Sequence, residues 1–240
     1  MIDKITKWIK NYSDLNNIKS LVVGISGGID SSVVSTLCAR TKKPVYVVSM
    51  PLNQIKSQHD LSISHGLWLK KNFSNISHHV IKLDDVYKKF YDLLSKDFSS
   101  ELALANSKSR LRMVVLHQIS ASTNGIVVGT GNKVEDFGVG FFTKYGDGGV
   151  DISPIADLMK SEVWEIGKKL GILQEIIDAP PTDGLWEDGR TDSDQLGGLT
   201  YDNMEDAMNN DQSPYFQEYL KIRNKNLHKM KPVPIFKKDE

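Results

Sequence analysis

The sequence has 240 residues and no net charge, because 30 Lys and Arg balance 30 Asp and Glu; 40% of the residues are hydrophobic and one is cysteine. This composition is typical of a globular protein and excludes a disordered tail, a fibre and a disulfide-stapled scaffold. Zero net charge also removes the general attraction on which non-specific binders of nucleic acids or anionic membranes depend, so we expect neither partner.

The apolar runs and the N-terminus predict where the protein works. The longest apolar runs, such as residues 21–25, are far shorter than the ~20 residues that cross a bilayer. The first residues lack the basic and apolar regions of a signal peptide. The lone Cys38 fits a reducing compartment. We therefore expect a cytoplasmic protein.

The first half of the chain predicts alternating helices and strands. Apolar residues at three- and four-residue steps predict helices over residues 2–12, 31–40, 57–72, 84–94 and 102–122. Short β-branched and aliphatic runs predict buried strands over residues 20–25, 45–50, 79–83 and 125–128. This order predicts an α/β fold, a doubly wound parallel sheet of about five strands flanked by helices, with ligands at the carboxyl ends of the strands.

The second half predicts long loops between helices. Residues 129–149 are rich in glycine and residues 179–198 in Pro, Asp, Gly and Thr, and loops of this length usually have a function. Helical patterns remain at residues 160–170, 200–210 and 214–230. No repeat and no linker interrupts the chain, so we expect one domain over residues 1–240.

The turn after the first predicted strand has the composition of an anion-binding loop. It reads Gly24-Ile25-Ser26-Gly27-Gly28-Ile29-Asp30-Ser31-Ser32. Glycines allow consecutive N–H groups and a helix N-terminus to approach a phosphate. The alternative is a plain strand-to-helix turn with a capping Ser or Asp. The Walker A lysine and the Gly-x-Gly-x-x-Gly spacing are both missing, so neither a P-loop GTPase nor a dehydrogenase is predicted.

Residues 26–31 of this loop resemble the pyrophosphate-binding loop of the N-type ATP pyrophosphatases, which cleave ATP between its α- and β-phosphates. Four further segments resemble the ammonia-dependent NAD synthetases in the right order: residues 129–135, 140–149, 181–186 and 228–229. The resemblance covers nearly the whole chain. It implies a ligase (EC 6.3.1.5) that adenylates the nicotinate carboxylate of deamido-NAD with ATP. Ammonia then displaces AMP, and the products are NAD, AMP and pyrophosphate.

The resemblance also implies an ATP site and a metal site. The residues it assigns to ATP are Gly24, Ile25, Ser26, Gly27, Gly28, Ile29, Asp30, Ser31, Thr130, Lys160 and Thr182. It assigns Mg²⁺ to Asp30 and Glu135, which we expect at strand ends, and Mg²⁺ prefers such oxygen ligands. From the residues alone, a helix-capping Asp30 and a solvated Glu135 fit equally well. Lys160 begins a predicted helix, where a cation is unfavourable unless an anion lies nearby.

For deamido-NAD, the resemblance implies binding by Arg110, Lys144, Asp151, His228 and Lys229. It implies Asp147 and Lys144 as catalytic residues, with Asp147 as the group that deprotonates ammonium. There are plainer alternatives. Asp147 could form a turn, and His228 and Lys229 could be cations that the dipole favours at the end of a helix. Arg110 and Arg112 are two residues apart on one helix, so we expect only one of them, Arg110, to reach the substrate.

The family implies a homodimer whose interface forms the substrate site. Ammonia is the expected nitrogen source, because the synthetase pattern leaves no room for a glutaminase domain and Cys38 has an apolar setting unsuited to a nucleophile. Two other functions remain open. A tRNA-modifying relative would share the ATP loop, but a basic excess and additional cysteines are missing. A nucleotide-sensing module would need the loop but not Glu135 or Lys160.

Overall fold

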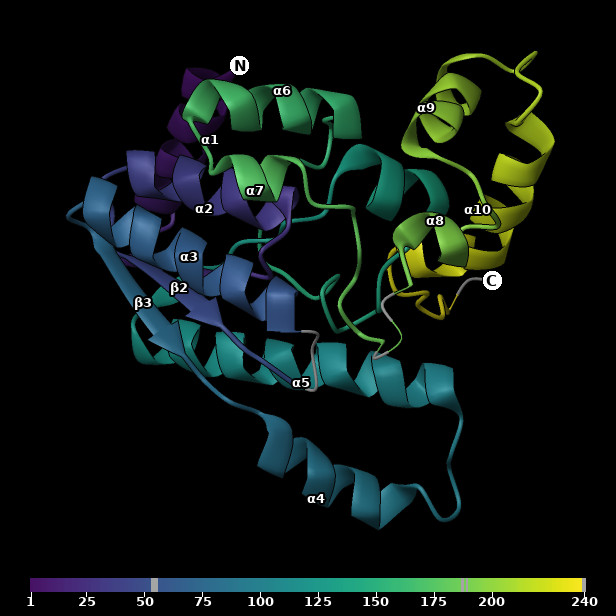
Figure 1. The fold of residues 1–240 in the computed structure, drawn as a ribbon, viewed down its shortest axis with the longest axis horizontal. Helices are drawn as coiled ribbons and strands as arrows, with labels where there is room; N and C mark the ends of the chain where they lie inside the picture. The colour runs from purple at the N-terminus through teal and green to yellow at the C-terminus, as the bar shows by residue number, and fades with distance from the viewer. Residues whose placement is uncertain (53–55, 187, 189, 239–240) are drawn as a thin grey trace.

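The sheet of this protein has four parallel strands within the part of the chain that the computed structural model describes, residues 1–52, 56–186, 188 and 190–238 (Figure 1). The strands are β1 (Ser20–Gly24), β2 (Val45–Ser49), β3 (Ile76–Val80) and β4 (Gly125–Val127). Their order is β3-β2-β1-β4. The predicted α/β class and parallel sheet are therefore confirmed. The expected number of about five strands differs slightly, because Val128 and Ile152 form only an isolated parallel bridge.

The strand order places a topological switch point between β1 and β4. From β1 the chain builds outward through β2 and β3, and it then returns to the other side of β1 to form β4. The connections leave the carboxyl ends of β1 and β4 in opposite directions, which opens a crevice between them. The anion-binding loop follows β1, and the glycine-rich segment follows β4.

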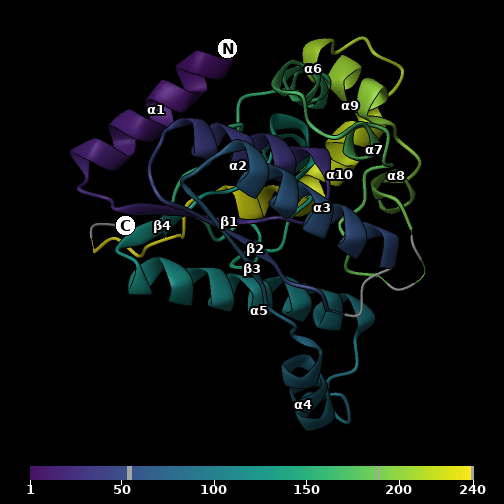
Figure 2. The same ribbon diagram turned by 60° about the vertical axis from the view of Figure 1, so that its left-hand side comes forward.

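Both faces of the sheet are covered by helices (Figures 1 and 2). Alternate residues of β1 point to opposite faces: Leu21 and Val23 pack with α1 (Ile2–Leu15), α2 (Ile29–Arg40) and α6 (Lys160–Leu170). Val22 packs with α5 (Glu101–Ser122) on the other face. The remaining elements of the sheet half are α3 (Lys56–Asn72), α4 (Asp84–Leu94) and the short α7 (Gln174–Ile177).

The predicted helices are confirmed to within three residues at each end, but the third strand was misplaced. It was expected over residues 79–83 and lies at Ile76–Val80. As an edge strand it buries only Ile76, so polar residues such as Ser77 and His78 are tolerated within it. The prediction depended on the apolar residue Leu83. This residue lies beyond the end of the strand and packs in the hydrophobic cluster between the sheet and α5.

The two predicted loops contain structure of their own. Residues 129–149 include a π-helical segment, η1 (Lys133–Val139), and residues 179–198 include the short α8 (Asp192–Gln195). With α9 (Tyr201–Asn209) and α10 (Phe216–Met230), η1 forms a third hydrophobic cluster. Figure 1 shows α9 and α10 to one side of the sheet. No helix among the described residues has the length and apolar character that crossing a bilayer requires.

Candidate active site

A cavity of about 720 Å³ opens at the carboxyl ends of β1 and β4. This size is within the usual range of small-molecule sites. Its walls are the anion-binding loop, the inner face of α5, the glycine-rich segment after β4, the segment before α8 and the end of α10. The cavity therefore lies in the crevice that the strand order creates.

The anion-binding loop leaves the N-terminus of α2 open. Gly27 has a left-handed backbone with φ of 93°, which favours glycine. The helix begins after Gly28, and no side chain caps it. The serine hydroxyls instead fold the loop onto itself: Ser31 Oγ donates to the Gly28 carbonyl at 3.1 Å and accepts from the Ser26 N–H at 3.2 Å. An uncapped helix N-terminus in a cavity is a site for a phosphate.

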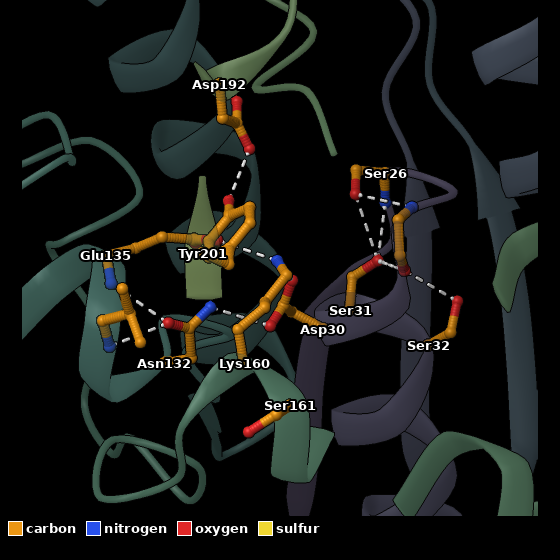
Figure 3. A network of polar contacts seen from close by, with 12 residues as sticks. Ser26, Asp30, Ser31, Ser32, Asn132, Glu135, Lys160, Ser161, Asp192 and Tyr201 are labelled. Carbon is orange, nitrogen blue, oxygen red and sulfur yellow. Dashed lines mark hydrogen bonds and ion pairs between the residues drawn. The ribbon is translucent and has the colours of Figure 1, made fainter. Parts of the chain in front are cut away.

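The Lys160 ammonium joins two carboxylates from distant parts of the chain (Figure 3). Its Nζ lies 2.5 Å from Asp30 Oδ2 and 2.8 Å from Glu135 Oε1. Lys160 is 2% exposed. Asp30 is in the first turn of α2 and Glu135 is in η1, so both acids follow strands of the sheet but belong to helices. The alternative in which Asp30 caps the helix is wrong, because Gly28 occupies the N-cap.

Burial and charge act against each other in this cluster. Burial lowers the pKa of Lys160, but Asp30 and Glu135 outweigh it and the pKa is raised. Burial also opposes ionisation of Glu135, whereas Lys160 and hydrogen bonds lower its pKa overall. For Asp30, burial is the larger influence and raises the pKa. With Lys160 charged and both acids ionised, the three side chains have a net charge of −1.

The cluster fits a divalent cation. Two carboxylates already hold one cation, the Lys160 ammonium, between them. They offer the oxygen ligands that Mg²⁺ prefers, and Mg²⁺ is commonly held by one or two carboxylates plus phosphate oxygens and water. Within the described residues, no group of three or more His, Cys, Asp and Glu side chains could hold a metal. A metal ion at this cluster would therefore need Asp30, Glu135 and the phosphate oxygens of a bound nucleotide as ligands.

Three residues of this cluster were missed by sequence reasoning. Asn132 is fully buried, donates to Asp30 Oδ1 at 3.0 Å and accepts from the N–H groups of Val134 and Glu135. The Tyr201 hydroxyl lies 2.6 Å from Glu135 Oε1 and 2.8 Å from Asp192 Oδ2. Asn132 was noticeable within the segment 129–135, but nothing in the sequence connects Tyr201 and Asp192 to the site.

The cavity also contains most of the residues expected at the second substrate. Arg110, Lys144, Asp147, His228 and Lys229 all line it, as do Thr130 and Thr182. Arg110 Nε donates to the Lys144 carbonyl at 3.2 Å, and Lys229 Nζ donates to the Phe142 carbonyl at 2.8 Å. Loss of surrounding water lowers the pKa of Lys229. This wall is therefore rich in cations.

Asp147 is held by the backbone and by α5. Its Oδ1 accepts hydrogen bonds from Ser109 Oγ at 2.6 Å and from the Thr143 N–H at 3.0 Å. Loss of water around the carboxylate raises its pKa, and these two hydrogen bonds oppose the shift. Asp151 is different: it is absent from the cavity wall, and its Oδ2 accepts from the Val127 N–H at 2.7 Å.

Both arginines of α5 line the cavity, and the expectation that only Arg110 reaches the substrate stays a prediction. The cavity extends along the helix, so that residues with different angular positions contact it. Arg112 Nε donates to the Met50 carbonyl at 3.2 Å. Its Nη2 is buried without a hydrogen-bond partner among the described residues. Burial lowers the pKa of Arg112 to about 10, opposed by Asp183, Asp147 and Asp84.

Comparisons with known proteins identify relatives of this chain. The NH(3)-dependent NAD(+) synthetase of Carboxydothermus hydrogenoformans is 38% identical over 83% of this chain and 80% of its own length. The enzyme of the same name from Finegoldia magna is 35% identical over 100% of this chain and 96% of its own. The second match covers the whole chain and therefore includes the segments that build the cavity as well as the anion-binding loop.

Two solved structures have the same fold. The NMN synthetase of Francisella tularensis matches with a TM-score of 0.89 and 30% identity, covering 98% of this chain and 96% of that one. The NH3-dependent NAD synthetase of Campylobacter jejuni matches with a TM-score of 0.76 and 28% identity, covering 98% and 97%. The family model of NAD synthase matches residues 1–237. The chain belongs to the NAD synthase family.

Proposed function

We propose that this protein is an ammonia-dependent NAD synthetase, a carbon–nitrogen ligase that converts deamido-NAD, ATP and ammonia to NAD, AMP and pyrophosphate. The observation that carries the proposal is the cavity of a NAD synthase family member in which an open phosphate loop lies beside the cluster of Asp30, Glu135 and Lys160. Names of relatives such as the Carboxydothermus hydrogenoformans enzyme support the same reaction. Residues 1–240 act as one synthetase domain in this proposal.

The chemistry requires an activated carboxylate. A nicotinate carboxylate oxygen attacks the α-phosphorus of ATP, the bond to the β-phosphate oxygen breaks, and pyrophosphate leaves. Ammonia then attacks the carbonyl carbon of the adenylate, and AMP leaves with the former carboxylate oxygen. The first step brings two anions together, so N–H dipoles and cations must offset their repulsion.

In this proposal the ATP phosphates bind to residues 24–31, with Thr130, Lys160 and Thr182 around them. The open N-terminus of α2 and the buried ammonium of Lys160 supply the positive end of the site. Asp30 and Glu135 would hold Mg²⁺, which when bound neutralises phosphate charge. Lys160 bonds to both of these carboxylates, so its ammonium lies beside the proposed metal and phosphate positions.

The second substrate binds to the cationic wall of the same cavity. Arg110, Lys144, His228 and Lys229 are the proposed contacts to deamido-NAD on this wall, and Asp151 is a proposed contact from outside it. Asp147 receives the proton of ammonium, which its raised pKa favours, and Lys144 assists at the reacting carboxylate. Arg110 and Tyr145 also border a second, shallower groove on α5. This arrangement supports a homodimer in which the grooves of two copies meet, and the protein is proposed to work in the cytoplasm.

A second substrate is favoured by one comparison. The solved NMN synthetase of Francisella tularensis matches 98% of this chain and 96% of its own, with a TM-score of 0.89. An enzyme with that name amidates a mononucleotide, and the carboxylate chemistry is identical. Deamido-NMN is therefore the second candidate for the substrate that this cavity amidates.

A pyrophosphate-release assay tests the proposal. Purified protein, ATP and Mg²⁺ are combined with deamido-NAD, with deamido-NMN or with neither, and each mixture receives ammonium or glutamine. We expect release that needs a carboxylate substrate, amide product with ammonium and none with glutamine. A higher kcat/KM for deamido-NMN would select the second candidate. Release without either substrate, or no release at all, would refute both and would favour the nucleotide-sensing or tRNA-modifying alternatives.

A further inference from the structure

Tyr201 contacts the site from a part of the chain distant from it in sequence. It begins α9, and its hydroxyl lies 2.6 Å from Glu135 Oε1 and 2.8 Å from Asp192 Oδ2 (Figure 3). Glu135 and Asp192 both line the cavity. The phenol of Tyr201, on α9, thus links the carboxylate of Glu135 in the cavity to Asp192 on α8.

The ring of Tyr201 is fixed by its neighbours. The Lys160 ammonium lies 4.8 Å from the ring centroid, and the ring packs edge-to-face on Trp164 at 5.8 Å. Tyr201 is also part of the third hydrophobic cluster, and it is 9% exposed. Packing therefore determines where the hydroxyl lies, because a ring held on several sides has one rotamer available.

The Tyr201 hydroxyl sets the orientation of the Glu135 carboxylate. Lys160 Nζ and Tyr201 OH both bond to Oε1 of Glu135. This leaves Oε2 as the oxygen that neither of them occupies. Apart from Lys160, Tyr201 is the side chain that bonds to Oε1 among the described residues.

We propose that Tyr201 is a positioning residue that orients Glu135 for divalent-cation binding, and that Asp192 holds Tyr201 in this role. The proposal rests on the proposed function in one respect, the use of Glu135 as a metal ligand. Groups behind a ligand fix its orientation, and their loss typically weakens metal binding about 10- to 100-fold. Tyr201 has no contact of its own with the bound ion in this account.

Asp192 provides a variant that separates the two roles of the Tyr201 hydroxyl. Its Oδ1 is buried and has no hydrogen-bond partner among the described residues. The Tyr201 hydroxyl has one proton, so Asp192 and Glu135 compete for it. An asparagine at position 192 would donate an N–H to the phenol oxygen and leave the phenolic proton for Glu135. Asp192→Asn is therefore expected to keep the positioning, whereas Tyr201→Phe removes it.

The test measures Mn²⁺ affinity by electron paramagnetic resonance, in the presence of saturating α,β-methylene-ATP, which is not cleaved. Tyr201→Phe keeps the ring and is expected to bind Mn²⁺ about tenfold more weakly, and Asp192→Asn is expected to bind it as tightly as the wild type. The matched control is Tyr219→Phe, a buried tyrosine of the same hydrophobic cluster. It should bind Mn²⁺ unchanged.

Equal Mn²⁺ affinity in Tyr201→Phe and the wild type would overturn the proposal and leave the proposed function intact. So would an equal loss in Tyr201→Phe and Asp192→Asn, because Asp192→Asn leaves the phenolic proton for Glu135 and its loss could not come from a lost orientation of that carboxylate. If the wild type itself binds no Mn²⁺ with the analogue, the proposed metal site fails, and the positioning role fails with it. Thermal melting of each variant separates a loss of orientation from a loss of folding.

Discussion

The charge balance of the site depends on one buried residue, Lys160. It lies at the start of α6, where a cation opposes the helix dipole. The sequence therefore indicated that an anion should lie nearby. The structure supplies two, Asp30 and Glu135. The attraction of these two carboxylates compensates Lys160 for the unfavourable helix dipole and for its burial. Without the lysine, the two carboxylates lose their cationic partner.

Lys160→Met is expected to destabilise the protein and to make its stability depend on metal. Removing one partner of a buried ion pair typically costs about 3–5 kcal/mol, because the remaining charge is uncompensated. Here two carboxylates are left facing each other, and Mg²⁺ can replace the ammonium. We expect a lower Tm in EDTA that Mg²⁺ raises more than it raises the wild-type Tm. Lys168→Met, an exposed change on the same helix, is the control; a variant that Mg²⁺ leaves unchanged would contradict the account.

A second prediction concerns His65, which is fully buried on α3. Its Nε2 lies 2.9 Å from Ser35 Oγ on α2, and its ring stacks on Trp68. Burial lowers its pKa from 6.5 to about 4. Because the folded pKa is below the unfolded one, the stability it contributes is present above pH 6.5 and is lost as the pH falls toward 4.

His65→Gln keeps a hydrogen-bond partner for Ser35 and does not titrate. We expect the wild type to be the more stable protein at pH 7, with the difference shrinking as the pH falls from 6.5 to 4. Urea denaturation at half-unit pH steps measures this difference. A stability difference that stays constant between pH 6.5 and 4 would contradict this prediction, because it would mean that His65 has the same pKa in the folded and unfolded states.

At the scale of elements, Asn132 couples the two halves of the site. Its carbonyl oxygen caps η1 through the N–H groups of Val134 and Glu135, while its amide nitrogen donates to Asp30 on α2. A single side chain therefore fixes both the segment that bears one acid and the carboxylate of the other.

Asn132→Ala is expected to cost about 1–2 kcal/mol of stability through the lost cap and to slow pyrophosphate release about tenfold or more, because neither acid stays in place. Denaturant melting and the pyrophosphate assay measure the two effects. Ser100→Ala removes the N-cap of α5 and should lower stability without slowing release. The same pyrophosphate rate in Asn132→Ala and the wild type would argue against this coupling.

The sequence predicted those elements whose pattern is local. Helices such as α4 and α6 have the bounds expected from their apolar spacing. The phosphate loop was recognisable because glycines and serines follow a buried strand. The glycine and polar content of η1 and α8 predicts loops, whereas tertiary packing and capping stabilise short helices there. Tyr201 and Asp192 join the site only through the packing of α9 and α8, which no local pattern encodes.

At the scale of the whole molecule, the outer face of α5 has exposed apolar side chains beside the cavity. Val114 and Tyr145 are 64% and 62% exposed, and both border the shallow groove beside Arg110. Such apolar exposure next to a substrate wall is typical of an interface. This face is where the proposed homodimer would bury its surface.

Val114→Glu is expected to shift the protein from dimer to monomer at micromolar concentration and to lower activity, since Arg110 lies one turn away on the same helix. Light scattering combined with the pyrophosphate assay measures both. Leu15→Glu, an exposed change at the end of α1, should alter neither property. A wild type that is monomeric and fully active would contradict the proposed dimer.

The central claim is that a substrate carboxylate attacks the α-phosphorus of ATP in this cavity, and isotope transfer tests it most directly. Deamido-NAD labelled with ¹⁸O in the nicotinate carboxylate is turned over with ATP, Mg²⁺ and ammonium, and the products are analysed by mass spectrometry. We predict one ¹⁸O atom in AMP, none in pyrophosphate and one carboxylate oxygen retained in the amide. Unlabelled AMP, or ¹⁸O in pyrophosphate or orthophosphate, would contradict the account.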